Sequence, residues 1–329
     1  MTDPTSPWRI LALPPIEEGL IEGLVAPLGE AVSLVPLPSR DTEGLHAALA
    51  DTELVIGDWS GVLRIDAAAV AAAPRLAFVQ MPAVGVDSLD VDAITAAGIP
   101  LANTAGANAR SVAEWAVGAA FALCRQLAWA DRRVRAGGWP QDELLRRRLR
   151  EIHTQRVGIL GYGSIGRTTA SLFAALGSPV SYWSRSSALP GYRELDDLLA
   201  TSDILVIALP RTPQTIGLLD AARLALLPRS AMVINVARGG ILDEDALLAA
   251  LDSGALGGAA LDVFGVEPPA VDSPLRRHEN ILLSPHIAGS TDQAMANIVN
   301  AVVDNMAAAV RGEPLHNVVN GVDPVVRRR

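Results

Sequence analysis

The sequence predicts an α/β fold made of two doubly wound parallel-sheet domains. First, short apolar strands alternate with helices along residues 8–104, a pattern typical of parallel sheets covered by helices. Second, the alternation resumes at residue 156 and opens on a strand, a glycine-rich turn and a helix. Third, the chain has 329 residues, of which 50% are hydrophobic and 19% charged, which is enough for two folded cores.

The first series of elements contains no glycine fingerprint for a nucleotide, so we expect that it does not form the nucleotide-binding domain. Its candidate strands are Arg9–Leu13, Val32–Pro36, Leu54–Gly57, Leu76–Gln80 and Ile99–Asn103. Its candidate helices are Glu43–Ala50, Ala67–Ala73 and Asp90–Ala97.

A long helix is predicted between the two series, from Ala109 to Ala136, because Gly137 and Gly138 follow it. Its first half is apolar on several faces, and such a helix is buried either in a core or in a subunit contact. The second alternative predicts a homodimer. The arginine-rich segment Asp142–Arg150 is expected on the surface.

The second series begins with a buried strand, Val157–Leu160, that runs into the sequence G-Y-G-S-I-G. Gly161 permits a tight turn, Gly163 lets the backbone approach phosphates, and Gly166 lets the helix pack closely on the strand. The helix N-terminus then offers free N–H groups to phosphates. An ordinary glycine-rich loop is the alternative, but a second strand at Val180–Trp183 favours a dinucleotide site. One face of the helix is expected to be buried, formed by Ile165, Thr169, Leu172, Phe173 and Leu176.

The end of that second strand bears on the choice of cofactor. A site for NAD usually places Asp or Glu there, about 20 residues past the turn, to bind the ribose 2′-hydroxyl. Here Ser184, Arg185 and Ser186 follow the strand, and no carboxylate occurs before Glu194. A guanidinium and hydroxyls can hold a 2′-phosphate, so we predict a preference for NADP(H). NAD(H) is the alternative if Arg185 is only a solvated loop charge.

The rest of the second series places polar residues after successive strands. The expected strands are Asp203–Leu209, Ala231–Val236, Gly258–Val263 and Asn280–Ser284, and the expected helices are Asp243–Ser253 and Asp292–Arg311. We expect the last helix to return to the first domain. Because ligands gather at the carboxyl ends of parallel strands, Arg238, Glu267 and His286 are candidate functional residues. The first domain adds a loop at 81–87 that contains Val84 and Gly85.

Composition disfavours several classes of partner. The net charge is −9 with no long basic run, so we expect neither nucleic acid nor anionic membrane to bind, and an anionic substrate needs local positive groups. The single cysteine, Cys124, is expected in the core of a protein from a reducing compartment. The apolar run Trp115–Cys124 is too short to cross a membrane and residues 1–7 lack a signal-peptide core, so a cytoplasmic location is expected. We predict no metal site.

A set of short motifs occurs in a fixed order along residues 80–293. The motifs are A-V-G-V-D (83–87), N-T-A-G-A-N (103–108), V-A-E (112–114), G-Y-G-S-I-G (161–166), N-V-A-R-G (235–239), L-D-V-F-G-V-E-P (261–268) and S-P-H-I-A-G (284–289). Together they resemble the D-isomer-specific 2-hydroxyacid dehydrogenase family. The resemblance implies a flavodoxin-like substrate domain of residues 1–103 and 290–329, a Rossmann nucleotide-binding domain of residues 104–289, and a cleft between them.

The resemblance also implies roles for the strand-end residues. His286 would be the acid/base that protonates the substrate carbonyl while hydride arrives from the nicotinamide, and Glu267 would pair with it. Arg238 would bind the substrate carboxylate or keto oxygen, and the backbone N–H groups of Val84 and Gly85 would bind the carboxylate. Implied cofactor contacts are Ser164, Ile165, Pro210, Val236, Ala237, Asp262 and Gly289. The remaining histidines are expected to be structural or exposed, and they are His46, His153, His278 and His316.

Taken singly, Arg238, Glu267 and His286 could be a solvated arginine, a loop carboxylate and a loop histidine. Their joint occurrence after successive strands favours a catalytic role. The Ser-Arg-Ser sequence at 184–186 resembles the subgroup that reduces glyoxylate and hydroxypyruvate with NADPH. Two departures bear on the substrate: Arg276 and Arg277 stand where the family often has Trp, and Thr104-Ala105-Gly106 replaces the common Thr-Pro-Gly. A bulkier or phosphorylated 2-hydroxy acid and a nucleotide-sensing corepressor remain alternatives. A formate enzyme is disfavoured by Leu283-Ser284-Pro285 before the histidine.

Overall fold

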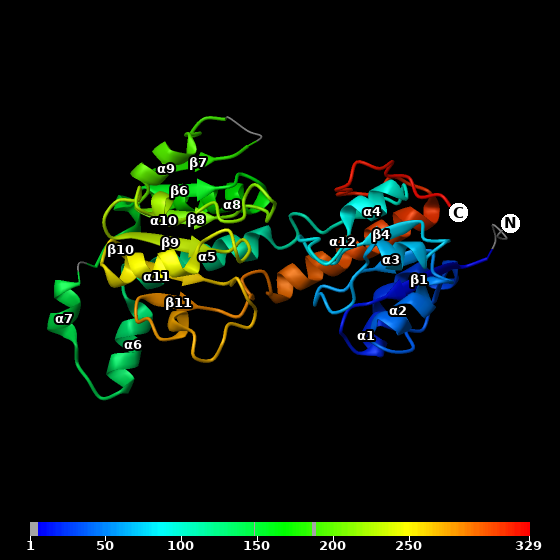
Figure 1. The fold of residues 1–329 in the computed structure, drawn as a ribbon, viewed down its shortest axis with the longest axis horizontal. Helices are drawn as coiled ribbons and strands as arrows, with labels where there is room; N and C mark the ends of the chain where they lie inside the picture. The colour runs from blue at the N-terminus through cyan, green and yellow to red at the C-terminus, as the bar shows by residue number, and fades with distance from the viewer. Residues whose placement is uncertain (1–5, 148, 186–188) are drawn as a thin grey trace. The chain divides into compact units, whose positions relative to one another are not determined.

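Two parallel sheets organise the chain, each in its own unit of the computed structural model (Figure 1). Unit 1 comprises Met1–Ala107 and Asp292–Arg329, and unit 2 comprises Asn108–Thr291. The structure describes residues 6–147, 149–185 and 189–329. The predicted α/β fold with two parallel sheets is confirmed.

The sheet of unit 1 has the strand order β2-β1-β3-β4-β5, and all of its pairings are parallel. This is the order of a flavodoxin-like sheet, which the resemblance implies. Both faces are covered, so β3, β4 and β5 are continuous runs of buried residues, whereas the edge strand β2 is only partly buried. The strands are β1 Trp8–Ala12, β2 Val32–Leu34, β3 Leu54–Ile56, β4 Phe78–Gln80 and β5 Leu101–Ala102.

Three helices of unit 1 have an aspartate as their N-cap residue. Asp41, Asp66 and Asp90 each accept a hydrogen bond from the N–H group three residues later, which satisfies a free donor of the first turn. The helices are α1 Glu18–Val25, the 3-10 helix η1 Ala26–Ala31, α2 Thr42–Leu49, α3 Ala67–Ala71, α4 Val91–Ala96 and α12 Asp292–Arg311. As expected, α12 packs on this unit, against β4 and η1. The sequence analysis missed α1 and η1.

The sheet of unit 2 has the strand order β11-β10-β9-β8-β6-β7, and it too is parallel throughout. The first strand of this unit, β6, lies between β7 and β8, so the chain runs outward from β6 to β7 and then returns past β6 to β8, where the strand order reverses. That reversal makes the end of β6 a place where ligands bind in doubly wound sheets. The strands are β6 Val157–Leu160, β7 Val180–Trp183, β8 Ile204–Ile207, β9 Ala231–Asn235, β10 Leu256–Leu261 and β11 Ile281–Leu283.

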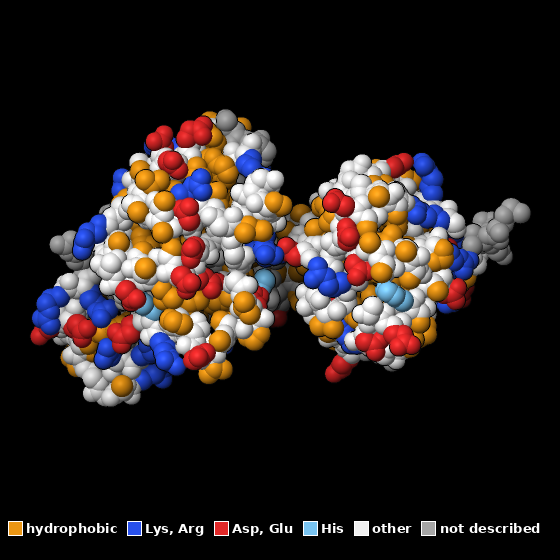
Figure 2. All heavy atoms as spheres, viewed as in Figure 1, with side chains coloured by type: hydrophobic (Ala, Val, Ile, Leu, Met, Phe, Trp, Pro, Cys, Tyr) orange, Lys and Arg blue, Asp and Glu red, His pale blue; other side chains and the backbone are white. Residues whose placement is uncertain are grey.

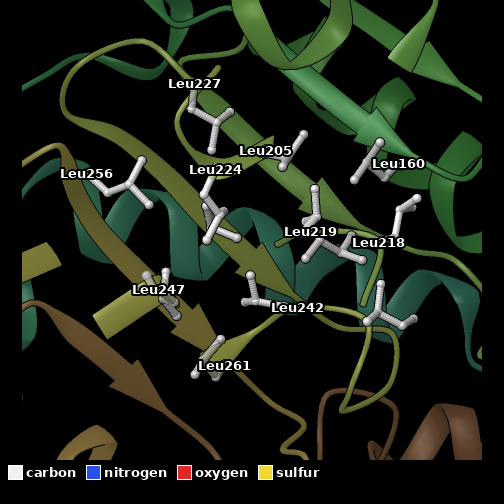
Figure 3. Packing of buried hydrophobic residues seen from close by; sticks show 14 of the residues in the cluster. Leu160, Leu205, Leu218, Leu219, Leu224, Leu227, Leu242, Leu247, Leu256 and Leu261 are labelled. Carbon is white, nitrogen blue, oxygen red and sulfur yellow. The ribbon is translucent and has the colours of Figure 1, made fainter. Parts of the chain in front are cut away.

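Helices cover both faces of this second sheet. On one face, leucine side chains from strands, helices and loops pack together, among them Leu205, Leu224 and Leu247 (Figure 3). On the other face, α5 packs against α8, β9 and β10. The helices are α5 Ala109–Cys124, α6 Leu127–Arg135, α7 Gln141–Arg146, η2 Ile152–Thr154, α8 Ser164–Ala175, α9 Leu195–Thr201, α10 Ala221–Leu224, α11 Glu244–Asp252 and η3 Pro274–Arg276.

Two predictions about helices are wrong in part. The single helix expected from Ala109 to Ala136 is broken into α5 and α6 at Gln126, whose φ of 55° lies in the left-handed region. Its side-chain amide donates to the Leu123 carbonyl, which satisfies part of the broken helix end. In α8, Thr169 and Phe173 are buried as expected, but Leu176 is 39% exposed because it lies beyond the end of the helix.

The apolar surface of α5 is largely used inside unit 2. Ala116, Ala120 and Cys124 are buried in the same cluster as strand residues of the sheet. Burial raises the pKa of the Cys124 thiol to about 11, as expected for a core residue. Arginine side chains gather on the surface over α6 and α7 (Figure 2). No helix of the described chain is long and apolar enough to cross a membrane.

Candidate active site

The candidate residues of unit 2 follow the carboxyl ends of its strands. Because the sheet is parallel, all of these ends lie at one edge. The glycine turn follows β6, and its neighbours are the segments after β7 and β8. The segments after β9, β10 and β11 carry Arg238, Glu267 and His286. The structure therefore puts the candidate nucleotide turn and the candidate chemical groups of this unit on the same edge.

The glycine turn has the shape that a pyrophosphate requires. Gly161 has a φ of 99°, and a Cβ added there would lie 2.5 Å from the carbonyl oxygen of Ala208. A Cβ on Gly166 would lie 1.9 Å from the carbonyl oxygen of Gly161. The helix can therefore pack this closely on the turn only if residue 166 is glycine. By contrast, a Cβ on Gly163 would meet nothing within 4 Å. Among the described residues, no side chain accepts a hydrogen bond from the first N–H groups of α8, which begins at Ser164 after the N-cap Gly163. Open space and free donors together fit a dinucleotide phosphate.

Because Gly166 is closely packed and Gly163 is open, we expect alanine at the first to affect stability and alanine at the second to affect cofactor binding. Gly166→Ala should lower the free energy of unfolding by about 3 kcal/mol, because the methyl group collides with backbone. Gly163→Ala should leave stability unchanged but weaken NADPH binding about tenfold, because the methyl group occupies the space the phosphates need. Urea unfolding and NADPH titration measure the two effects. Normal NADPH affinity in Gly163→Ala would mean that the phosphates bind elsewhere.

The segments after β7 and β8 contain four more of the predicted cofactor residues, Ser184, Arg185, Ser186 and Pro210. Ser184 is half-buried and Arg185 is exposed directly after β7, while Ser186 lies outside the described residues. The β7 residue Tyr182 stacks on Tyr162 of the glycine turn, with ring centroids 3.6 Å apart. Pro210 is exposed two residues after Ala208 and accepts a hydrogen bond through its carbonyl from the Thr215 hydroxyl. The stacked rings tie the turn to the strand whose end carries the candidate 2′-phosphate ligands.

His286 and Glu267 form a directed pair. The Nδ1 atom of His286 lies 2.8 Å from Oε2 of Glu267, and Oε1 of Glu267 accepts a hydrogen bond of 2.8 Å from the backbone N–H of Phe264. A carboxylate only accepts hydrogen bonds, so Nδ1 carries the proton of this contact. The Nε2 atom has no partner among the described residues and is left to exchange a proton with a ligand. The imidazole is 46% exposed, which gives a ligand access to it.

Asp262 holds the turn that carries His286. Its carboxylate is buried and accepts hydrogen bonds from the Ser284 hydroxyl and from the backbone N–H groups of Ile287 and Ala288. Its own carbonyl accepts from the His286 N–H at 2.8 Å. His286 has a φ of 55°, an uncommon conformation that a surrounding network must maintain. The sequence analysis assigned Asp262 only a cofactor contact and missed this positioning role; the cofactor contact stays a prediction.

Arg238 extends from a loop that packs on the segment after β10. The Asn235 side chain accepts from the Ala237 N–H and donates to the Arg238 carbonyl, which closes the turn. A Cβ on Gly239 would lie 1.7 Å from the Phe264 carbonyl oxygen, so the two loops touch through backbone. Arg238 is half-buried, and its Nη1 donates to the Ala237 carbonyl at 2.8 Å. Val236 and Ala237 are buried.

Asn108 is a further candidate that the sequence analysis did not single out, although it quoted the motif that contains it. Its Oδ1 atom is buried and has no hydrogen-bond partner in the described part of the chain. A Cβ on Gly289 would lie 2.5 Å from Asn108 Nδ2, so the asparagine amide lies against the backbone after β11. A buried acceptor without a partner is costly, and a ligand or water donor would relieve that cost.

Unit 1 presents a tethered loop that contains Val84 and Gly85. The Asn103 side chain donates to the Val84 carbonyl at 2.7 Å, and the Thr104 N–H donates to the Ala83 carbonyl at 3.2 Å. These bonds use carbonyl oxygens, and the N–H groups of Val84 and Gly85 have no acceptor among the described residues. The loop can therefore offer two donors, and its role in binding a carboxylate stays a prediction.

Comparison with known proteins gives consistent results. The model of the D-isomer specific 2-hydroxyacid dehydrogenase, NAD binding domain, family matches residues 117–288. A D-3-phosphoglycerate dehydrogenase from Mycobacterium leprae is 35% identical over 312 residues, which are 93% of this chain and 58% of that protein. A glyoxylate reductase from Aeropyrum pernix is 35% identical over 296 residues, 86% of this chain and 84% of that protein. The D-mandelate dehydrogenase structure from Rhodotorula graminis covers 97% of this chain with a TM-score of 0.88 at 23% identity, which shows the fold.

Proposed function

Because the chain belongs to the D-isomer specific 2-hydroxyacid dehydrogenase family, we propose that it transfers hydride between a nicotinamide cofactor and a small 2-oxo or 2-hydroxy acid. The chain spans 58% of the length of the M. leprae relative, so the activity is proposed for the chain as given. The observation that carries the proposal is the His286–Glu267 contact of 2.8 Å, at the same sheet edge as the glycine turn. In this proposal, unit 2 binds the cofactor.

The geometry suits acid/base catalysis by His286. When bound, the nicotinamide supplies hydride to the carbonyl carbon in reduction, or accepts it in oxidation. His286 gives the proton on Nε2 to the carbonyl oxygen as the hydroxyl forms, and Glu267 keeps the ring oriented through Nδ1. Arg238 holds the substrate carboxylate or keto oxygen through its planar fork. In the reverse direction, neutral His286 takes the hydroxyl proton through the same atom.

We further propose that NADP(H) is preferred and that Arg185 is the reason. Arg185→Ala should raise the KM for NADPH about tenfold and leave the KM for NADH nearly unchanged, because only NADPH carries the 2′-phosphate. Arg193→Ala is the control, since this exposed arginine near the same strand donates to the Ser181 hydroxyl. A higher kcat/KM with NADH in the wild type, or an unchanged KM for NADPH in Arg185→Ala, would contradict the preference.

For the substrate, we propose glyoxylate or hydroxypyruvate. Relatives at 35% identity are named both glyoxylate reductase and D-3-phosphoglycerate dehydrogenase, so their names do not decide between these substrates. The proposal therefore rests on the Ser-Arg-Ser sequence after β7. The experiment is a panel of 2-oxo acids, from glyoxylate to an aryl 2-oxo acid, against NADPH and NADH. Turnover of the bulky acids alone would refute this substrate choice, and no turnover of any acid would refute the enzymatic function. Assembly as a homodimer and a cytoplasmic location stay predictions.

A further inference from the structure

A pocket of about 450 Å³ opens beside the His286–Glu267 pair in unit 2. Its volume lies in the range of small-molecule sites and is far more than a two-carbon acid fills. Most of the lining is apolar, from Phe264, Leu283 and Pro268 among others. The ionisable residues that line it are Glu267, Arg276 and His286.

Arg276 is the charged group of this pocket that the proposed reaction leaves unused. Both oxygens of Glu267 are engaged, by His286 and by the Phe264 N–H. The Arg276 guanidinium donates through Nη2 to the Pro269 carbonyl at 2.8 Å, a bond that fixes its orientation and leaves most of its N–H groups available. Across the described residues, no carboxylate lies within ion-pair distance of Arg276. The Arg276 guanidinium is exposed to solvent, has no carboxylate partner among the described residues, and lines the pocket that also contains His286.

We propose that Arg276 is a specificity-determining residue that binds a second anionic group on the substrate. In this arrangement Arg238 holds the 2-oxo carboxylate, and the remote carboxylate or phosphate of the same molecule meets Arg276. In this proposal the apolar lining of the pocket contacts the carbon chain that leads to Arg276. A fixed guanidinium binds either anion by charge-assisted hydrogen bonds. The inference rests on the proposed hydride transfer and extends its substrates from glyoxylate and hydroxypyruvate to 2-oxo acids with an acidic side chain.

The test compares acids of matched size with and without the second charge. 2-Oxoglutarate and 2-oxopentanoate have the same number of carbons and differ by one carboxylate, and 3-phosphohydroxypyruvate supplies a phosphate. The wild type should show the lower KM for the acids with the second charge. Arg276→Gln should raise the KM for those acids about tenfold or more and change the KM for 2-oxopentanoate less than about twofold. Whichever anion loses more identifies the preferred second group.

Two matched variants sharpen the result. Arg277→Gln removes the neighbouring exposed arginine, which does not line the pocket, and should leave every KM unchanged. Arg276→Lys keeps the charge without the planar fork and should restore part of the affinity. A wild type without preference for the doubly charged acids, or an equal KM increase for all acids in Arg276→Gln, overturns the inference. If the wild type reduces no 2-oxo acid with either cofactor, the proposed function fails and the inference falls with it.

Discussion

Replacement of His286 by Gln is expected to lower kcat/KM for 2-oxo acid reduction by about 10²–10⁴-fold. Glutamine is similar in size and can still contact Glu267, but it cannot carry a proton to the carbonyl oxygen. The glycine turn is untouched, so NADPH should bind with its wild-type Kd. Steady-state kinetics and fluorescence titration of NADPH measure the two quantities separately.

His153→Gln is the control for this prediction. His153 is also in unit 2 and also lies beside a glutamate, with Nδ1 3.4 Å from Glu151 Oε2, but it belongs to the 3-10 helix η2 before β6. Its replacement should leave kcat/KM unchanged. Activity of His286→Gln within a few-fold of the wild type across the pH range would remove the imidazole from the mechanism.

Replacement of Arg238 by Gln is expected to have the next largest effect, a loss of about 10²–10³-fold in kcat/KM. The guanidinium would hold a carboxylate or keto oxygen with two parallel hydrogen bonds, and glutamine can supply at most one uncharged donor. Arg238→Lys keeps the charge but not the fork, so it should recover only part of the loss. KM and kcat for a single 2-oxo acid, measured at saturating NADPH, report the effect.

The outcome of that experiment also separates binding from folding. Arg238 is half-buried and the loop is held through the Asn235 side chain and the close contact of Gly239 with Phe264, not through the guanidinium alone. Both Arg238 variants should therefore unfold at the same urea concentration as the wild type. Wild-type kinetics in Arg238→Gln would show that the substrate carboxylate is bound by another group.

The sequence predicts the sheets well because each strand is a short apolar run followed by a turn residue. The strand–turn–helix around Gly161 follows from a pattern that is local in the chain, whereas the flavodoxin-like order of unit 1 is implied only by the family resemblance. Gln126 marks the limit of such reasoning. No glycine or proline at Arg125 or Gln126 indicates the break between α5 and α6, and the left-handed conformation of Gln126 is seen only in the folded structure.

Some residues of the candidate site can likewise be predicted from the sequence, and the roles of others are seen only in the structure. Arg238, Glu267 and His286 can be found from the sequence because each follows a recognisable strand and belongs to a motif. The positioning role of Asp262 could not, since it depends on hydrogen bonds to Ser284 and to the turn around His286. The pocket beside Arg276 likewise depends on how the loops after β10 and β11 fold, which no spacing in the chain reveals.

The most direct test of the central claim follows the hydride itself. The protein is incubated with hydroxypyruvate and NADPH that carries deuterium on one face or the other of nicotinamide C4, and the product glycerate is analysed by mass spectrometry and chiral chromatography. The account predicts D-glycerate with one deuterium at C2, from one face of the nicotinamide only. Unlabelled product from both labelled cofactors, labelled product from both, or the L-isomer would contradict it.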